Sequence, residues 1–319
     1  MNRKRTAWAV ALISLVLLGV CLLLGASGIG IPENRDILIL RMTRILAGFI
    51  VGAGLSCAGV VLQALLRNPL AEPYVLGVSS GAALGAAVAI LSGLAAMSAI
   101  AVPAVAFVSA MLALICVYRL ATYYGGISVY GLIISGVIVS AMCSSILMFL
   151  VSLASSRGLH DIIWWMLGSL QPSSRSLLVI CSATIALGLA ATWVMARELN
   201  ALTLGSDIAH YVGVRTSVAV SIGLALATLL AATSVSLAGL IGFVGLIVPH
   251  VTRSLVGADH RRLVPYAALL GGVFLAVCDA VARIALEGRE IPVGVITALL
   301  GGPFFIFILR RRTTQGWIE

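Results

Sequence analysis

Long uncharged stretches dominate the pattern of apolar and polar positions along this chain. Asp, Glu, Lys and Arg are absent from residues 6–32, 45–66, 73–118 and 216–252. About 20 consecutive apolar residues in a helix cross the ~30 Å hydrocarbon core of a bilayer. Several of these stretches are therefore long enough for one membrane span, and 73–118 is long enough for two. The pattern predicts a protein that works in or across a membrane.

Gly, Pro and Ser residues separate most of the apolar stretches and divide the chain into ten expected helices. Their ranges are 8–28, 44–66, 75–91, 98–118, 130–153, 176–196, 217–233, 239–254, 264–285 and 293–310. The boundary after 233 is the least marked, because Thr233-Ser234-Val235-Ser236 is polar but uncharged, and counts of nine and eleven stay open. We expect an all-α, polytopic membrane protein in which residues 1–319 form a single transmembrane domain.

The composition agrees with this interpretation. Hydrophobic residues make up 61% of the chain and charged residues 10%, whereas a soluble protein carries roughly 25% charged residues. A basic start, Arg3-Lys4-Arg5, precedes the first apolar stretch, but signal-peptide cores are only about 7–15 residues long. We expect an uncleaved first helix, with a signal peptide as the alternative. The cysteines all lie in apolar stretches without metal-ligand spacing, which indicates packing residues.

The distribution of basic residues predicts the orientation. With the N-terminus inside, the inner segments hold 13 of the 20 Lys and Arg residues: Arg3, Lys4, Arg5, Arg67, Arg119, Arg197, Arg215, Arg253, Arg261, Arg262, Arg310, Arg311 and Arg312. The outer segments hold the other 7: Arg35, Arg41, Arg44, Arg157, Arg175, Arg283 and Arg289. Because cytoplasmic loops are enriched in Lys and Arg, both termini are expected in the cytoplasm. The outer arginines are numerous enough to suggest an external partner.

Several kinds of chemistry find no support in the sequence. Lys4 is the only lysine, so the chain cannot build a Walker A loop, and any ATP and Mg²⁺ must be bound by another subunit. Gly77-Val78-Ser79-Ser80-Gly81 matches the G-x-S-x-G pattern of hydrolases, but it opens a glycine-rich helix and follows no strand. The histidines lie at span ends or in loops, which argues against a haem-bearing cytochrome. We expect no catalytic residues, no metal site and no cofactor in this chain.

One ionisable pair falls inside an expected helix. Asp279 and Arg283 are four residues apart and share a helix face. Secondary carriers use ionisable groups inside the membrane, but a neutralising pair within one helix is the simpler interpretation. Small residues also recur every fourth position, at Gly48 and Gly52 and at Gly77, Gly81 and Gly85. Close helix packing explains such spacing; a lining for a bulky solute is compatible with it.

Three segments between the expected helices are candidates for function. Arg41 and Arg44 stand three residues apart at the outer start of the second helix, where two guanidinium groups pointing outward together would suit carboxylates of an external protein. Interfacial anchoring is the alternative. The inner loop 67–73 contains Pro69 and Pro73, which stiffen it and stop the helices on both sides. A simple turn is the alternative for this loop.

The third segment, 197–215, is the longest inner connection. Ser206 or Asp207 can cap a short helix there, and Gly213 can end it. Ile208, Tyr211 and Val212 would share one face, and a short external helix with an apolar face needs a groove in a partner. Packing on the lipid surface is the alternative.

These segments, in this order, resemble the permease subunits of the BtuC/FecCD family. Arg41 to Leu46 is similar to the family pattern R-x-x-R-x-L, and 204–214 is similar to its coupling segment. The other similar segments are 59–73, 76–82, 238–250, 257–261, 292–298 and 301–305. One departure is Ser206, where relatives often carry an acidic residue, which puts the electrostatics of that position in doubt.

The resemblance implies a fold and partners. The subunit would have ten helices and would work as one of a pair, expected to be a homodimer, in a bacterial or archaeal cytoplasmic membrane. Two ATPases would dock on the coupling segment, about 199–214, through Leu202, Leu204, Gly205, Ser206, Asp207, Ile208, Val212 and Gly213. An external binding protein would meet Arg41, Arg44 and Arg283. The path and its gates would involve the fifth and tenth helices and Asn68, Pro69, Leu70, Glu72, Pro73, Gly77, Ser79, Ser80 and Gly81.

The resemblance also implies the cargo. Iron(III)-siderophore is expected first, because it is the commonest cargo in such a family, with haem and cobalamin as alternatives. The sequence itself does not name the solute, because cargo is chosen largely by the binding protein. Two other classes stay open. A secondary transporter or channel would need an ionisable relay and no ATPase. A membrane enzyme would need a catalytic pair inside the bundle, and the sequence suggests none.

Overall fold

The computed structural model describes residues 3–25, 28–32, 34–122, 128–172, 174–286 and 289–313. Ten helices in this part of the chain correspond to the ten expected: α1 (Arg3–Leu23), α2 (Arg35–Leu65), α3 (Val78–Leu91), α5 (Ala101–Ala121), α6 (Val129–Ser152), α8 (Arg175–Val194), α11 (Thr216–Ala238), α12 (Val244–Val256), α13 (His260–Ile284) and α14 (Val293–Thr313). Six of them, α2, α5, α6, α8, α11 and α13, are long and apolar enough to cross a membrane by length and composition, and the apolar parts of the other four are shorter. The expected all-α membrane fold is confirmed.

Several short elements connect these helices. They are the 3₁₀ turn η1 (Pro73–Leu76), the helices α4 (Leu94–Met97), α7 (Ser156–Leu167), α9 (Ala196–Thr203) and α10 (Ser206–Tyr211), and the antiparallel strands β1 (Leu24–Gly25) and β2 (Gly28–Ile29). Helix α7 was not expected from the sequence. It is capped by Ser155, which accepts a hydrogen bond from the Gly158 amide, and it buries Ile162. Helix α7 is thus a short amphipathic helix that packs on the bundle through its apolar side.

Several predicted boundaries were wrong. The seventh helix, for example, continues to Ala238 and does not end at 233. The first helix ends at Leu23 and not at 28, because the chain turns back there into the β1–β2 hairpin. The second begins at Arg35 and not at 44, because Asn34 caps it by accepting a hydrogen bond from the Asp36 amide. The eighth begins at Val244 and not at 239, and the five residues before it are not helical.

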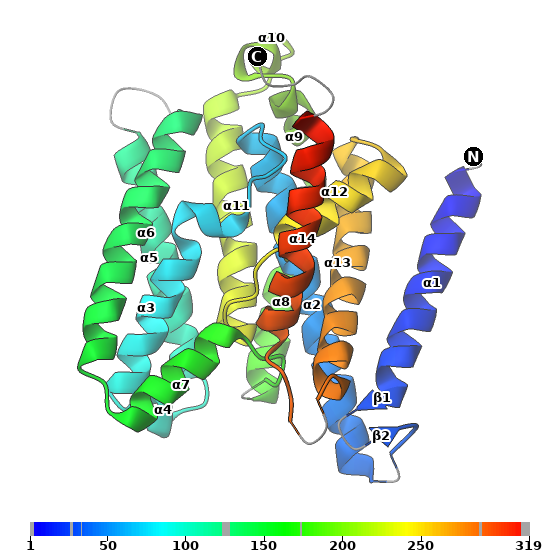
Figure 1. The fold of residues 1–319 in the computed structure, drawn as a ribbon. Coiled ribbons are helices and arrows are strands. Elements are labelled where there is room, and N and C mark those ends of the chain that lie inside the picture. The colour runs from blue at the N-terminus through cyan, green and yellow to red at the C-terminus, as the bar shows by residue number, and fades with distance from the viewer. Residues whose placement is uncertain are drawn as a thin grey trace.

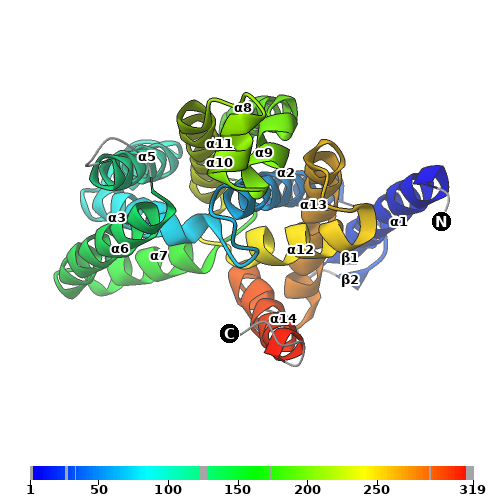
Figure 2. The same cartoon turned by 90° about the horizontal axis from the view of Figure 1, so that it is seen from above.

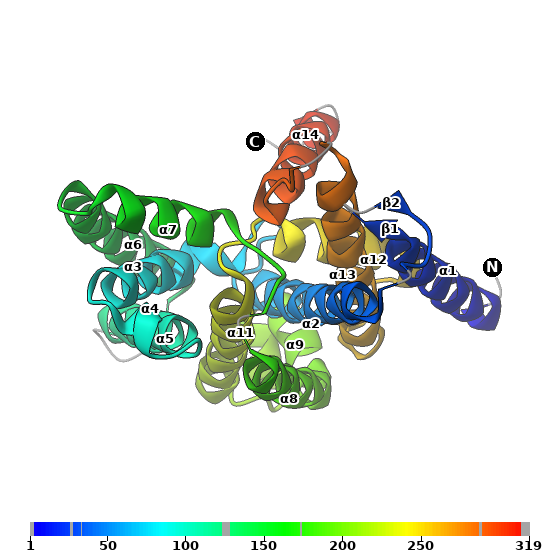
Figure 3. The ribbon, with the colours of Figure 1, turned by 90° about the horizontal axis from the view of Figure 1, so that it is seen from below.

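Helix α2 lies at the centre of the bundle, between α13 and α11 (Figure 3), and is the most deeply buried of the six long spans. It approaches α13 so closely that a Cβ atom at Gly52 would collide with the carbonyl oxygen of Gly271. Helices α3 and α5 meet in the same way: a Cβ at Gly81 would lie 2.7 Å from Ala113 Cβ, and one at Gly85 would lie 2.6 Å from Ser109 Cβ. The interpretation of the small residues as close-packing positions is confirmed at these sites.

The two ends of the bundle carry different elements (Figure 1). The start of α1, the end of α14, and α9 and α10 lie at one end, which we call the terminal end. The β1–β2 hairpin, α4 and α7 lie at the opposite end, which we call the hairpin end. Seen along the bundle, α6, α7 and α14 project on the same side of the molecule and flank η1 and the start of α12 (Figure 2).

Candidate functional site

A buried ion cluster occupies the hairpin end. Arg44 Nη2 lies 2.8 Å from Asp279 Oδ1, and Arg44 Nη1 lies 2.7 Å from Glu290 Oε2. Arg283 Nε lies 3.1 Å from Asp279 Oδ2, one helical turn along α13. Asp279 is fully buried, and its carboxylate is neutralised by the two arginines, one on each oxygen. The neutralising Asp279–Arg283 pair is confirmed, and Arg44 is a partner that the sequence did not reveal.

Arg41 makes a different set of contacts. Its Nη1 donates to the carbonyl oxygens of Leu22 at 3.1 Å, Leu23 at 3.4 Å and Gly30 at 2.8 Å, and its Nη2 donates to Gly28 O at 3.2 Å. These carbonyls belong to the end of α1 and to the β1–β2 hairpin. Arg41 therefore fastens the first helix to α2.

The expectation that Arg41 and Arg44 point outward together was wrong. They are 4% and 7% exposed, and Arg283 is 3% exposed. Since α2 begins two turns earlier than expected, both arginines lie within the helix and face α1, the hairpin and α13. Among the described residues close to this cluster, Arg35, Asp36, Arg289 and Glu290 are exposed charges. Glu290 is the link between the buried cluster and the surface, because its side chain is 45% exposed while it holds Arg44.

In the middle of the bundle, Ala238, the last residue of α11, leads into the non-helical residues 239–243, and we call residues 238–243 the crossing segment. Two side chains from the loop before α3 hold it. Tyr74 Oη donates to Ile241 O at 2.8 Å and accepts from Ile241 N at 2.9 Å. Glu72 Oε1 accepts from Phe243 N at 2.5 Å, next to the first turn of α12. Irregular backbone is tolerated inside a membrane protein where the protein satisfies its polar groups, and here two side chains do so.

Other elements pack tightly on the crossing segment. Ser169 N donates to Ala238 O at 2.8 Å. A Cβ at Gly239 would overlap the carbonyl oxygen of Trp165, and one at Gly301 would overlap the ring of Phe243. The ends of α7, α11, α12 and α14 and the loop before α3 therefore meet at one place. A shift of any of them must be accommodated by the crossing segment, which fits a gate region.

The residues predicted for the path and gates fall into two groups. Asn68 and its neighbours form a turn, in which Asn68 Oδ1 accepts from Leu70 N at 3.0 Å and Asn68 O accepts from Ala71 N at 3.0 Å. Pro73 is buried, and a Cβ at Gly245 would lie 2.8 Å from its Cδ. Gly77 separates η1 from α3 with a φ of 80°. Such a left-handed residue favours glycine, so the expected third helix is broken at this point.

The serines and the second glycine of this region lie in the first turn of α3. Ser80 Oγ donates to Gly77 O at 3.1 Å, and Ser79 is partly buried. Gly81 is a packing position against α5. The element directly before Gly77 is the 3₁₀ turn η1 and not a strand, so these residues do not form the strand-to-helix turn of a G-x-S-x-G hydrolase.

The coupling segment predicted at 199–214 consists of α9, α10 and the turn that follows. Leu202 is buried, whereas Leu204, Ile208 and Val212 are exposed and Tyr211 is 86% exposed. The expected apolar face of the short helix is therefore present, and the described residues leave it uncovered (Figure 1). Gly213, with a φ of 87°, ends the helix as expected, and Val214 N donates to Ala209 O at 2.9 Å.

The expected cap of α10 was wrong. The residue before the helix is Gly205, with a φ of 119°, and neither Ser206 nor Asp207 bonds an amide of the first turn. Ser206 Oγ instead lies 3.5 Å from Asp207 Oδ1. Both side chains are exposed. The left-handed backbone of Gly205 sets the angle between α9 and α10 in place of a side-chain cap.

Asn200, in α9, joins the coupling segment to α13. Its Nδ2 donates to Asp259 Oδ1 at 2.8 Å, and its Oδ1 accepts from His260 N at 2.9 Å. Asp259 is the cap of α13 and also accepts from Arg261 N at 3.1 Å. The hydrogen bond from Asn200 holds the pKa of the Asp259 carboxyl below its usual value. No local sequence signal reveals this junction, since the two segments are about 60 residues apart.

Comparison with known proteins identifies the family. Residues 16–311 match the model of the FecCD transport family. The chain belongs to this family. It is therefore a multi-pass membrane permease of an ABC importer, and the family is one of transport subunits and not of catalytic enzymes.

The FecCD relatives carry different cargo names. The cobalamin import system permease protein BtuC of Halobacterium salinarum is 42% identical over 288 residues, which are 90% of this chain and 77% of that protein. The hemin transport system permease protein HmuU of Yersinia pestis is 36% identical and covers 86% of this chain and 83% of its own length. The vitamin B12 import system permease protein BtuC of Salmonella paratyphi A is 34% identical, with coverage of 97% and 96%.

A solved structure is similar over almost the whole FecCD chain. It is described as an inward-facing conformation of a metal-chelate type ABC transporter, and it aligns with a TM-score of 0.88 at 30% identity. The alignment covers 97% of this chain and 99% of that one. The family and the arrangement of the helices are thus supported by independent comparisons.

Proposed function

We propose that this chain is the membrane-spanning subunit of an importer that moves an organic metal chelate across the cytoplasmic membrane. The observation that carries the proposal is the combination of FecCD membership with an uncovered helix, α10, at the terminal end. The chain itself binds no cofactor in this proposal. ATP and Mg²⁺ are used by two cytoplasmic ATPase subunits, and an external binding protein delivers the cargo.

A second copy of this chain completes the path. Helices α6 and α14 carry large exposed apolar side chains, among them Met148, Phe149, Leu299 and Phe307. They flank η1 and the start of α12 on one side of the molecule (Figures 2 and 3). A partner that covers this side would enclose the predicted path residues between two copies, and it would bury apolar surface as obligate interfaces do.

The ATPases dock on α10 and the turns beside it. The predicted contact residues are Leu202, Leu204, Gly205, Ser206, Asp207, Ile208, Val212 and Gly213. Of these, the exposed apolar side chains of Leu204, Ile208 and Val212 suit a hydrophobic groove in the partner. Leu202 and Gly205 are buried, so they support the shape of the segment and do not face the partner.

Helix α13 transmits the movement of the coupling segment. Asn200 bonds both residues at its start, and Asp279, at the other end of the same helix, bonds Arg44 of α2. Twenty residues of helix from Asp259 to Asp279 span about 30 Å. ATP binding can shift the permease between conformations only if it favours one of them. A rigid helix bonded at both ends would carry that preference to the hairpin end.

The binding protein docks at the hairpin end, with Arg44 as the principal contact and with Arg41 and Arg283 supporting it. Arg44 is buried in the single chain, and the half-exposed Glu290 covers it. A carboxylate of the binding protein would replace Glu290 on Arg44, and the displaced Glu290 would turn toward the exposed Arg289. Arg41 and Arg283 support this contact indirectly, because they hold α1 and Asp279 in place. Such charge contacts set register and speed of encounter more than affinity.

The gate consists of the loop 68–81 and the crossing segment. Glu72 and Tyr74 hold the crossing segment in the described conformation, through bonds to Phe243 and Ile241. Opening toward either side would stretch or break these bonds. The chelate itself meets mostly apolar side chains and small residues, so it is not trapped on its way.

The cargo is an iron(III)-siderophore type of chelate in the first instance, as the family resemblance implies. Cobalamin is a second candidate, because the 42% identical protein of Halobacterium salinarum carries that name. Haem is a third, favoured by the name of HmuU. In this proposal both termini lie in the cytoplasm. The excess of Lys and Arg in the inner segments supports this orientation, as does the joint position of the start of α1, the end of α14, and α9 and α10 at the terminal end.

The test is reconstitution in vesicles with the ATPase subunits and the binding protein. We expect ATP-dependent accumulation of one of the three labelled chelates: ferric siderophore, cobalamin or haem. Vesicles that lack the ATPase subunits are the control, and accumulation against a gradient in them would refute the proposal. Changing Ile208 and Tyr211 to Glu should release the ATPases while leaving the melting temperature unchanged, since both side chains are exposed.

A further inference from the structure

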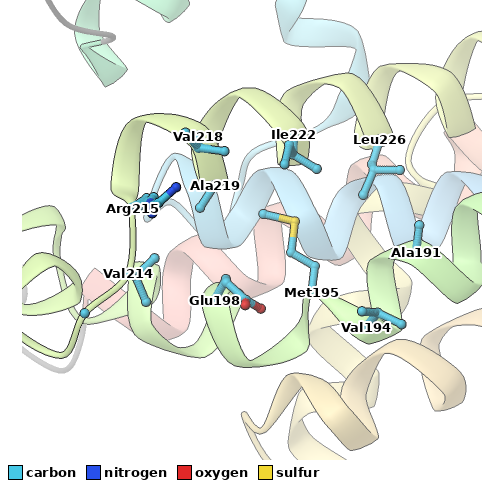
Figure 4. Close-up of a pocket in the computed structure, with 11 residues that line it drawn as sticks. Ala191, Val194, Met195, Glu198, Val214, Arg215, Val218, Ala219, Ile222 and Leu226 are labelled. Atoms are coloured by element: carbon cyan, nitrogen blue, oxygen red, sulfur yellow. The ribbon is translucent and has the colours of Figure 1, made fainter.

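An elongated pocket opens on the side of the bundle near the terminal end, between α8, α9 and α11 (Figure 4). Its volume is about 700 Å³, which is within the roughly 300–1,000 Å³ range of small-molecule sites. It is lined by Ala191, Val194, Met195, Glu198, Gly213, Val214, Arg215, Val218, Ala219, Ile222 and Leu226. None of these residues belongs to the predicted path, and only Gly213 is among the predicted ATPase contacts.

The polarity of the pocket changes along its length. Glu198 and Arg215 lie toward one end, and Val218, Ile222 and Leu226 follow each other along α11 toward the other (Figure 4). From Arg215 to Leu226 the helix rises by about 16 Å. The pocket therefore has a charged head, with one group of each sign, and an apolar tail long enough for much of an acyl chain.

The two charges in the head lack partners in the described chain. Glu198 Oε2 is shielded from solvent and has no hydrogen-bond partner among the described residues. Neither Glu198 nor Arg215 forms an ion pair within the 4.0 Å limit with another described residue. A shielded carboxylate oxygen without a donor is costly. A ligand that brings a cation to Glu198 and an anion to Arg215 would remove that cost.

We propose that this pocket binds a phospholipid whose head group carries both a primary ammonium and a phosphate, as phosphatidylethanolamine does. The ammonium donates to Glu198, and the phosphate accepts from the guanidinium of Arg215. One acyl chain lies along Val218, Ile222 and Leu226. Lipid is the occupant that fits the place, because Val194, Val218 and Ile222 are exposed large apolar side chains on the outer side of the bundle. The two charges lie at the ends of the spans, at the depth expected of head groups.

The test uses the full chain, purified in detergent and stripped of lipid. It is titrated separately with dioleoyl-phosphatidylethanolamine, dioleoyl-phosphatidylcholine and dioleoyl-phosphatidylglycerol, and bound lipid is counted by native mass spectrometry. We expect one tightly held phosphatidylethanolamine, retained about tenfold better than the other two, since one charge-assisted hydrogen bond accounts for a factor of that size. Phosphatidylcholine has no N–H donor for Glu198, and phosphatidylglycerol has no cation.

Variants separate the roles of the two charges. Glu198→Gln should abolish the preference for phosphatidylethanolamine, whereas Arg215→Gln should weaken retention of all three lipids about tenfold. Ile222→Trp should also weaken all three, because the indole fills the tail of the pocket. Arg197→Gln and Asp161→Asn are matched controls, since both residues are exposed and neither lines the pocket. Both controls should retain lipid as the unmodified chain does.

Three outcomes would overturn the proposal. One is equal retention of the three lipids by the unmodified chain. Another is unchanged selectivity in Glu198→Gln together with unchanged retention in Arg215→Gln. Displacement of the bound lipid by added ATPase subunits would show that the pocket is a protein contact, and it would overturn the proposal as well. Transport is not measured, so the result does not depend on the proposed function.

Discussion

The bonds between Tyr74 and the crossing segment offer the sharpest test of the gate. The hydroxyl of Tyr74 serves both polar groups of Ile241, donating to its carbonyl at 2.8 Å and accepting from its amide at 2.9 Å. Ile241 is 1% exposed, so no solvent replaces these bonds. Tyr74→Phe keeps the ring and removes only the oxygen.

The expected cost follows from the two groups that are left. Each buried backbone group without a partner costs about 1–3 kcal/mol, and the two together give a loss of about 2–6 kcal/mol in the free energy of unfolding. At about 2 °C per kcal/mol for a chain of this size, the melting temperature should fall by roughly 4–12 °C.

The assay is thermal unfolding of the purified chain in one detergent, followed by intrinsic fluorescence. Tyr130→Phe is the matched control, because Tyr130 is 76% exposed, and its melting temperature should not change. If Tyr74→Phe melts within ~1 °C of this control, the hydroxyl does not hold the crossing segment. The description of Tyr74 as a gate residue would then be wrong.

Three further predictions concern the bonds and close contacts that join the helices. Asp279→Asn should destabilise the chain by about 3–5 kcal/mol, because it leaves the buried Arg283 without a counter-charge and Arg44 with Glu290 alone. Glu290→Gln should cost about 1 kcal/mol at most, since Glu290 is half-exposed; equal shifts in melting temperature would contradict this. Gly52→Ala should lower the free energy of unfolding by about 1–3 kcal/mol, because the added Cβ collides with the backbone of α13. Gly19→Ala is the control: a Cβ there meets nothing within 4 Å, so the same unfolding experiment should show no loss of stability. Asn200→Ala should leave the ATPase subunits bound in a co-purification but reduce uptake per ATP hydrolysed, since it cuts the bonds between α9 and the start of α13; unchanged coupling would exclude Asn200 from transmission.

Much of the fold can be predicted from the sequence, because membrane spans are encoded locally by uncharged apolar stretches. All ten expected helices have a counterpart. Two of the errors occur where charge was taken as a sign of a loop. Arg41 and Arg44 lie inside α2, and Arg157 and Asp161 lie inside α7. In the second case the sequence held a usable signal, since Leu159, Ile162 and Met166 follow helical spacing.

The candidate site is less predictable because its contacts join distant parts of the chain. Glu72 and Phe243 are 171 residues apart, and Arg44 and Asp279 are 235 apart. No spacing rule connects such pairs. The pair Asp279–Arg283 was predictable because it lies within one helical turn. The start of α12 was not predictable, because side chains of the loop before α3 hold the residues before Val244 in a non-helical conformation.

The way in which the first helix is attached has a consequence for motion. Within the described residues, the side-chain hydrogen bonds that reach α1 from other helices end at Cys21, Leu22 and Leu23, in its last turn. The rest of its described length is held by packing instead, since Ser14 is 3% exposed and Leu17 and Leu18 border apolar grooves beside α13 and α2 (Figure 1). A tilt of α13 or α2 would therefore act on α1 through sliding apolar contacts along most of its length and through directional polar bonds only at its last turn.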